Sequence, residues 1–424
     1  MTREIPKPRM LDWFALLLLV LSVCINYADR GNLGVAAKSL STELHLVPEQ
    51  LGYLLAAFSL TYAFSQVLAG KIIDRWNVNW VYATGFLLWS AATGLTGLAR
   101  TFSGILILRL LLGISESIAY PAYSKMIVIS FPERLRGTAN ALIDAGSKLG
   151  PAIGVLLGVK MIQWFTWRGM FLVMGGASLL WLVPWCFVAA KLPTQSPGIS
   201  KSDARVPALK QILLRRPFWG TALGLFGGNY TWFVFLNWLP YYFESERHYK
   251  HDRLALFGSL PFWTAGISSL LFGVLADALI RRGWEAGRVR QAFVCFGLIG
   301  CCGLMLPAVV VLDASLANGL LLLASASLGA WSSNHWALTQ LLSGPQAAGT
   351  WTGLQNCLGN LAGVVGQIVS GYALQSTHSF FAPFAIAGAV LVIGVFGYSL
   401  VVGRPQEEQW ELAPAGQLEA GSSH

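Results

Sequence analysis

Residues 25–32 read Ile-Asn-Tyr-Ala-Asp-Arg-Gly-Asn, and this stretch lies inside the first long apolar run of the chain. It places two adjacent charges, Asp29 and Arg30, about halfway along a segment long enough to cross a lipid bilayer. A charged side chain at that depth costs roughly 2.5–3.5 kcal/mol on insertion scales unless it faces a partner or a water-filled cavity. Adjacent residues point about 100° apart on a helix, so each charge needs its own partner from another helix.

The composition is that of a polytopic membrane protein. Of 424 residues, 55% are hydrophobic and only 12% are charged, whereas soluble domains carry about 25% charged residues. The first ten residues are polar and basic, and the apolar run behind them is long enough to span a membrane, so we expect no cleaved signal. The six cysteines all fall in apolar runs, which indicates small buried side chains rather than disulfides.

Twelve apolar segments follow one another along the chain, and a polar stretch from residue 193 to residue 216 separates the first six from the last six. Most of the 29 basic residues fall in the tails and in the loops on the side of the N-terminus. Because cytoplasmic loops carry an excess of Lys and Arg, this predicts cytoplasmic termini and a multi-pass protein of the inner, or plasma, membrane. The segments cover about 14–37, 50–73, 78–98, 103–131, 135–160, 167–190, 217–243, 254–280, 290–312, 315–342, 348–375 and 380–402.

This pattern predicts four parts of the chain. They are an N-terminal six-helix bundle over residues 1–191, a cytoplasmic linker over 192–216, a C-terminal six-helix bundle over 217–403 and a disordered cytoplasmic tail over 404–424.

A weak internal repeat supports the division into halves. The pattern Gly-x-x-x-Asp ends the second segment at residues 70–74 and the eighth segment at residues 273–277. Two copies at matching places indicate two parallel six-helix repeats. In this element we expect the acids and bases to cap and bridge helix ends and to act in gating: Asp74, Arg75, Asp277 and Arg281.

The doubled Gly-x-x-x-Asp element, the six-linker-six plan and the Asn-Tyr-Ala-Asp-Arg stretch at 26–30 resemble the major facilitator superfamily. Within it, the chain is similar to the anion:cation symporter family, which includes bacterial galactonate, glucarate and hexuronate transporters and the vesicular glutamate and sialic-acid transporters of animals. The resemblance implies an all-α membrane protein with the major facilitator fold, in which twelve transmembrane helices form two six-helix bundles. It also implies transport by alternating access.

Two more charges lie in the fourth segment, Arg109 and Glu116. Seven residues are nearly two helical turns, so these two side chains point the same way. The simplest arrangement pairs Asp29 with Arg109 and Arg30 with Glu116. Buried ion pairs stabilise a fold poorly, and ionisable residues inside a membrane commonly serve function, so we interpret the four charges as more than a packing device.

Such a site can couple an anion to a proton. Burial disfavours the charged form of a carboxylate, whereas a nearby arginine favours it. An anionic substrate that takes over the arginine leaves the carboxylate unpaired, and the carboxylate then binds a proton more readily, so each ligand favours the other. In the family that this chain resembles, the residues matching Asp29 and Glu116 handle the proton. Those matching Arg30 and Arg109 partner them, and the match of Arg30 also helps to hold the substrate carboxylate.

Further polar side chains of the N-terminal half are candidate substrate contacts. The resemblance implies that role for Tyr27 and Tyr62, whose matches bind substrate in family members. Asp144 and Lys148 stand one helical turn apart in the fifth segment, so they form a self-neutralised pair or leave the lysine as a second positive charge for the substrate. Some relatives carry a glutamine near this position. The lysine therefore indicates a dianion, or a carboxylate held by Lys148 instead of Arg30.

The C-terminal half carries almost no charge in its apolar segments and has clusters of amides, hydroxyls and indoles instead. Such groups suit a polyol, which needs hydrogen-bond donors and acceptors and a flat apolar face. The resemblance implies substrate contacts at Ser333, Trp336 and Asn360, with Asn229 a looser match. Each amide alone is more commonly glue between helices, worth about 0.6 kcal/mol, and we expect His335 to be an interior, hydrogen-bonded histidine.

Together these features predict a proton-coupled importer of an organic anion. A sugar acid such as galactonate, glucarate or a hexuronate is the first expectation, and the alternative is a transporter or exchanger of an aromatic acid or a dicarboxylate. The sequence has no Walker A loop, no His-Glu-x-x-His and no dinucleotide fingerprint, so we expect no enzyme, cofactor or metal site. The expected partners are a small organic anion, protons and the lipid bilayer. We expect a monomer and, because the inner loops account for the positive charge, no nucleic acid.

Overall fold

The computed structural model describes residues 8–131, 133–193, 207 and 209–410. Within the helices a few side chains are also outside the described set, that of Asp74 among them. Apart from connecting turns, the described residues are helical. They form α1 (Met10–Leu44), α2 (Pro48–Arg75), α3 (Val78–Thr96), α4 (Phe102–Glu116), α5 (Ala119–Ser130), α6 (Glu133–Leu179), α7 (Leu182–Ala189), α8 (Leu209–Leu213), α9 (Arg216–Ser245), α10 (His251–Arg281), α11 (Ala286–Val310), α12 (Ala314–Thr377), α13 (Phe381–Phe396) and the π-helical turn η1 (Gly397–Val401).

The twelve predicted spans are found in these helices, although two helices each contain two spans. Thr166, with φ 70°, breaks α6, and Gly344, with φ 63°, breaks α12. Conversely, α4 and α5 together form one predicted span, with a short break after Glu116. Eight helical stretches of the described chain are long and apolar enough to cross a membrane by length and composition. Helices α2, α3 and α9, which are not among these eight, and the break within α6 account for the remaining spans.

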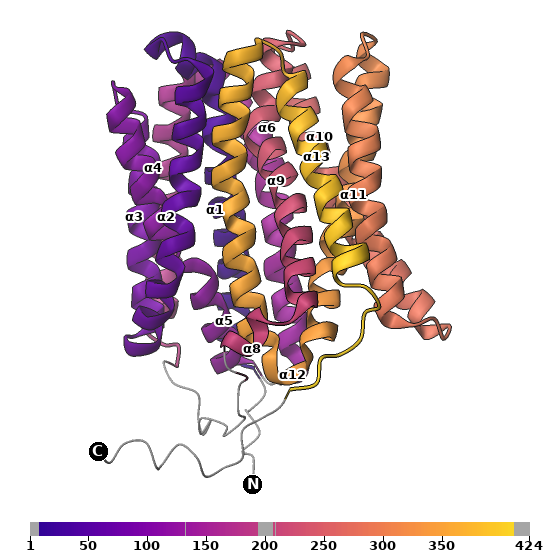
Figure 1. The fold of residues 1–424 in the computed structure, drawn as a ribbon. Helices are drawn as coiled ribbons and strands as arrows, with labels where there is room; N and C mark the ends of the chain where they lie inside the picture. The colour runs from indigo at the N-terminus through magenta and orange to yellow at the C-terminus, as the bar shows by residue number, and fades with distance from the viewer. Residues whose placement is uncertain (1–7, 132, 194–206, 208, 411–424) are drawn as a thin grey trace, which may run out of the picture.

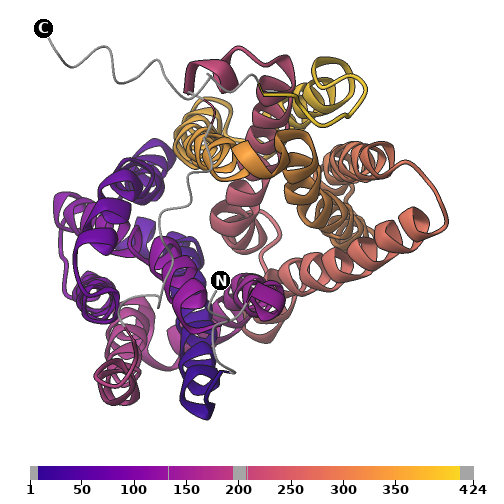
Figure 2. The same ribbon diagram turned by 90° about the horizontal axis from the view of Figure 1, so that it is seen from below.

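The helices form two bundles that run side by side (Figure 1). Seen along the helices, α1–α7 lie on one side and α9–α13 on the other (Figure 2). Three pairs of helices join the bundles: α1 with α9, α2 with α12, and α6 with α10. The six cysteines lie within the helices, and none of them forms a disulfide bond within the described part of the chain.

The bundles are in direct contact at the end opposite the starts of α1 and α9. A Cβ added to Gly34 would lie 2.6 Å from the carbonyl oxygen of Asn237, which shows how closely α1 approaches α9. Further along α1 and α9, Lys38 Nζ donates to the carbonyl oxygen of Glu244 at 3.4 Å. Between α6 and α10, Lys160 forms an ion pair with Asp252. This end of the molecule, which we term the closed end, is therefore sealed by direct contact between the bundles.

The segment 404–410 differs from the expectation of a disordered tail beginning at residue 404. Its last residue, Trp410, donates its indole hydrogen to the carbonyl oxygen of Ser343 at 2.9 Å, beside the break in α12. Glu408 forms an ion pair with Arg215 at 3.4 Å, which links the segment to the start of α9. Local polarity predicts disorder, but these contacts with folded helices hold the segment. The rest of the predicted tail, residues 411–424, lies outside the described residues.

Candidate functional site

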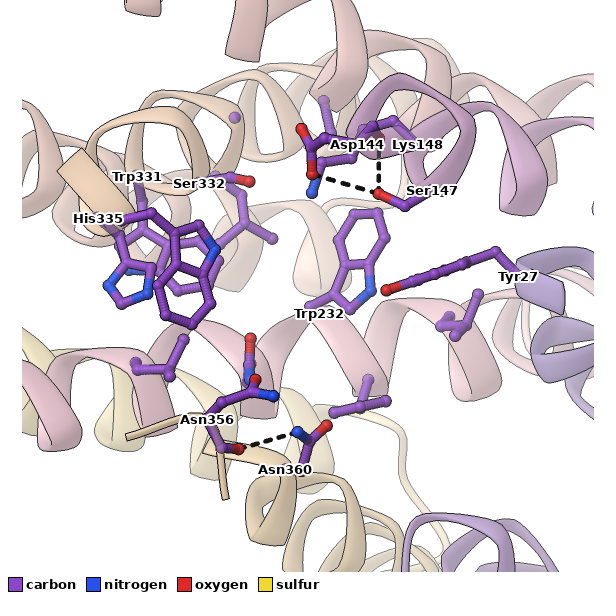
Figure 3. Close-up of a pocket in the computed structure, with 18 of the residues that line it drawn as sticks. Tyr27, Asp144, Ser147, Lys148, Trp232, Trp331, Ser332, His335, Asn356 and Asn360 are labelled. Atoms are coloured by element: carbon purple, nitrogen blue, oxygen red, sulfur yellow. Dashed lines mark hydrogen bonds between the residues drawn. The ribbon is translucent and has the colours of Figure 1, made fainter. Parts of the chain in front are cut away.

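A cavity of about 360 Å³ lies between the two bundles. Its size is within the range of small-molecule sites. Helices α1, α2, α5 and α6 contribute to its wall from one bundle, and α9, α10 and α12 from the other (Figure 3). It contains all the predicted substrate contacts except Ser333, namely Tyr27, Arg30, Tyr62, Lys148, Asn229, Trp336 and Asn360.

Arg30 lies at the boundary between the cavity and the interior of the N-terminal bundle. Its Nε donates to Glu116 Oε2 at 2.9 Å, so one of the two predicted ion pairs is present. Its guanidinium carbon lies 4.5 Å from the ring centre of Tyr27 and 4.4 Å from that of Tyr62. Nη2 of Arg30 and Oε1 of Glu116 are buried and have no hydrogen-bond partner among the described residues. The pair is therefore joined by a single hydrogen bond, and both groups keep unused bonding capacity.

The second predicted pair, Asp29 with Arg109, is not formed. Among the described residues, no nitrogen–oxygen distance of 4.0 Å or less joins the two side chains. Asp29 instead accepts a hydrogen bond from Asn32 Nδ2 at 3.1 Å, one turn along its own helix. Arg109 lies with its guanidinium carbon 5.4 Å from the ring centre of Phe58, and in the described part of the chain its Nε has no hydrogen-bond partner.

The four charges do not all meet in one accessible chamber. Arg30 lines the cavity, whereas Asp29, Arg109 and Glu116 do not. These three side chains lie within the bundle with exposed fractions of 1%, 2% and 0%. Arg30 is thus the one member of the group through which a ligand in the cavity acts directly on the others.

Asp144 and Lys148 both line the cavity, and among the described residues they form no ion pair with each other. Asp144 accepts a hydrogen bond from the hydroxyl of Ser147 at 3.4 Å (Figure 3). The Lys148 ammonium lies 5.4 Å from the ring centre of Trp232 on α9, across the boundary between the bundles. The self-neutralised pair that helical spacing allows is absent, so the lysine presents its charge to the cavity.

The C-terminal wall is made of neutral polar and aromatic side chains. Asn229 donates to the carbonyl oxygen of Gly359 at 3.1 Å, and Asn360 to that of Asn356 at 2.9 Å. These bonds use part of each amide and fix its orientation. His335 is buried and its Nδ1 is 2.8 Å from the hydroxyl of Tyr398, in agreement with an interior, hydrogen-bonded histidine.

Ser333 is absent from the cavity wall, and its neighbour Ser332 is part of it. The hydroxyl of Ser333 donates to the carbonyl oxygen of Gly329 at 3.3 Å, within its own helix. Its Cβ is 3.6 Å from the position that a Cβ on Gly273 would take, so the side chain faces α10. A shift of one residue turns a side chain by about 100° on a helix, which separates the two serines.

Some residues of the cavity wall were not predicted as substrate contacts, although helical periodicity places them on the same helix faces as predicted contacts. Trp232 follows Asn229 by three residues on α9, and Asn356 precedes Asn360 by four on α12. Residues at these spacings share a helix face. Extending the predicted contacts by one turn along each helix therefore finds both Trp232 and Asn356.

The repeated Gly-x-x-x-Asp element lies away from the cavity. Asp277 forms an ion pair with Arg290 and so bridges the ends of α10 and α11. The bases of the two copies, Arg75 and Arg281, are exposed. The side chain of Asp74 lies outside the described set. In the part of the chain that the structure describes, no group of three or more His, Cys, Asp or Glu side chains is placed to hold a metal ion.

Comparisons with known proteins agree on one family. Residues 19–367 match the family model of the Major Facilitator Superfamily. The probable sulfoacetate transporter SauU of Cupriavidus necator is 31% identical over 416 residues, which cover 94% of this chain and 96% of that protein. The D-galactonate transporter of Escherichia coli is 28% identical over 421 residues, with 94% and 97% covered. The probable galactarate/D-glucarate transporter GudP of Bacillus subtilis is 26% identical over 426 residues, with 94% and 93% covered.

A solved structure shares the architecture. It is that of a bacterial homolog of the human lysosomal transporter Spinster, in an inward-facing and unoccupied conformation. The two folds superpose with a TM-score of 0.82 at 17% sequence identity, and the match covers 96% of this chain and 100% of the other. At this identity the likeness shows the fold.

Proposed function

Because the chain belongs to the major facilitator superfamily, we propose that it imports an organic anion together with protons by alternating access, with a sugar acid as the first candidate substrate. The protein is a multi-pass membrane transporter rather than an enzyme, as are the relatives described above. We place it in the inner membrane as a monomer with both termini in the cytoplasm, in line with the distribution of basic residues.

The position of Arg30 carries this proposal. It is a cation in the cavity wall whose acidic partner, Glu116, lies behind it with an exposed fraction of 0%. An anion that binds Arg30 from the cavity competes with Glu116 for the same guanidinium. A buried carboxylate that loses its cation is more stable as the neutral acid, so anion binding favours uptake of a proton. By linkage, the proton favours the anion equally.

Asp29 has a second part in this scheme. It is buried beside Asn32 and has no cation within 4.0 Å among the described residues. We assign Asp29 and Glu116 to the carriage of protons between the two sides, with Arg109 as the buried cation that partners them. Their placement behind Arg30 keeps these groups out of the substrate cavity, so that the proton and the substrate occupy separate places at the same time.

The wall of the C-terminal bundle supports a polyhydroxylated substrate. Asn229 and Asn360 supply amide donors and acceptors, and Trp336 supplies a flat apolar surface. A carboxylate held at Arg30 would direct the remainder of the molecule toward these neutral groups. The D-galactonate transporter among the relatives is in line with a sugar acid.

A second candidate is another small acid, such as an aromatic acid or a dicarboxylate. The indoles of Trp232 and Trp336 in the cavity wall favour a flat ring. The relative named for sulfoacetate widens this class to sulfonates. A transport screen that includes sugar acids, aromatic acids and dicarboxylates separates the candidates.

The test is a thermal-shift titration of purified protein with this panel, followed by transport assays in proteoliposomes. Arg30→Ala is expected to abolish ligand-induced stabilisation, and unchanged affinity would exclude Arg30 as the anion site. Glu116→Gln is expected to lose accumulation driven by a pH gradient and to keep exchange of substrate across the membrane. Glu246→Gln, an exposed acid at the closed end, is the matched control. Accumulation by Glu116→Gln against a gradient would refute the coupling role.

A further inference from the structure

Two cations line the cavity from different helices, Arg30 on α1 and Lys148 on α6. We propose that Lys148 is a second anion subsite, and that the transported species carries two acidic groups, one bound at Arg30 and one at Lys148. This inference rests on the proposed function, because it names the class of substrate that the same cavity transports.

Lys148 has unused bonding capacity. An ammonium group has three donors, and among the described residues no carboxylate lies within 4.0 Å of it. The ammonium nitrogen lies 5.4 Å from the ring centre of Trp232. A cation over an aromatic ring gains about 0.5–2 kcal/mol, and this contact leaves the ammonium hydrogens available to an anion in the cavity.

The stem of Lys148 is fixed by the contact between the bundles. A Cβ added to Gly266 on α10 would lie 3.3 Å from the Cβ of Lys148, so α10 packs directly against the base of the side chain. The ammonium then projects into the cavity beside Trp232 (Figure 3). The lysine is therefore held at a defined place and does not extend to the lipid.

Asp144 does not take the place of a substrate anion at Lys148. It is exposed, lies one turn earlier on the same helix, and accepts a hydrogen bond from Ser147. Water in the cavity screens the charge of an exposed carboxylate more effectively than that of a buried one. Asp144 thus lowers the net positive charge of the wall without forming a contact that an incoming anion must break.

Aromatic side chains connect the two proposed subsites. The ring of Tyr27 lies 4.5 Å from the guanidinium carbon of Arg30, and its hydroxyl end points toward Trp232 (Figure 3). Trp232 in turn lies against Lys148. A diacid that lies along these two rings and is long enough to bridge the cations would bind both of them, whereas a monoacid would leave one without a counter-charge.

The experiment compares matched acids that differ by one acidic group. Galactarate and galactonate, malonate and acetate, and phthalate and benzoate form such pairs, and sulfoacetate supplies a sulfonate. Binding is measured by thermal shift and by competition for uptake in wild type, Lys148→Gln and Lys148→Arg. Lys191→Gln, a lysine at the end of the same bundle and absent from the cavity wall, is the control.

In each pair of acids that the wild type binds, its affinity for the diacid is expected to exceed its affinity for the monoacid. Loss of a charge-assisted hydrogen bond lowers affinity by about 10- to 100-fold, so Lys148→Gln should weaken the diacid by this factor and leave the monoacid within about twofold. Lys148→Arg should retain the preference for the diacid. Lys191→Gln should behave as wild type.

The outcomes separate this inference from the function on which it rests. If Lys148→Gln weakens both acids of a pair equally, or neither, the second subsite is refuted while a role for Arg30 stands. If the wild type binds none of the acids, the proposed function fails and this inference fails with it.

Discussion

Gly34 offers a direct test of the closed end. A Cβ at this position would lie 2.6 Å from the carbonyl oxygen and 2.8 Å from the Cα of Asn237, which are backbone atoms and cannot rotate away. Ordinary contact begins at 3.4 Å, so in Gly34→Ala the two helices must separate by roughly 0.8 Å, the difference between 3.4 and 2.6 Å. Overpacking of this kind costs about 1–3 kcal/mol.

That cost falls on one conformation. In alternating access the bundles separate at this end when the cavity opens there, and the added methyl group then meets no backbone. A difference of about 1–3 kcal/mol between two states changes their ratio about 5- to 150-fold. Gly34→Ala is therefore expected to shift the protein from the closed-end conformation toward the one that is open at this end.

The assay is a distance measurement between spin labels at residues 42 and 376, which are exposed near the ends of α1 and α12. The variant should show a larger population at long distance and slower transport. Gly353→Ala is the control, because a Cβ there has nothing within 4 Å. A Gly34→Ala protein with the distance distribution and transport rate of the wild type would refute the argument.

Three further predictions concern single side chains. Asp144→Asn should raise affinity for a diacid by up to about fivefold, the range for exposed charge interactions, and weaker binding by titration would contradict it. Asp277→Asn breaks the ion pair with Arg290 and should lower stability by less than about 1 kcal/mol while slowing uptake; an unchanged uptake rate would remove the gating role. Trp410→Ala should destabilise the protein by about 1–2 kcal/mol, which a lower melting temperature would show. The control Gln406→Ala, at an exposed position of the same segment, should not change the melting temperature. Equal melting temperatures of the two variants would show that the 404–410 segment does not stabilise the fold.

The sequence predicts the architecture well because span length and hydrophobicity are local properties. Each of the twelve predicted spans lies in helix, including those joined across Thr166 and Gly344. The Arg30–Glu116 pair was also predictable. A charge inside the membrane needs a partner from another helix, and the spacing of seven residues places Glu116 on the same helix face as Arg109. These inferences need only helix geometry and the cost of charge in a membrane.

Inferences that depend on side-chain direction or on tertiary contacts were less successful. Asp29 bonds to Asn32 on its own helix rather than to Arg109, and spacing cannot choose between those partners. Lys148 faces Trp232 of the other bundle instead of Asp144, because packing against α10 directs its side chain. Ser332 rather than Ser333 reaches the cavity, an error of one helical position.

The buried polar atoms of the N-terminal bundle limit its thermal stability. Within the part of the chain that the structure describes, Asp29 Oδ2, Arg109 Nε and Glu116 Oε1 lack hydrogen-bond partners. Each such atom makes the folded bundle less stable than an apolar group at the same place would. Leucine at positions 29 and 109 together should therefore yield a protein that melts at a higher temperature and moves nothing. Natural selection for a working carrier thus opposes selection for durability at these positions.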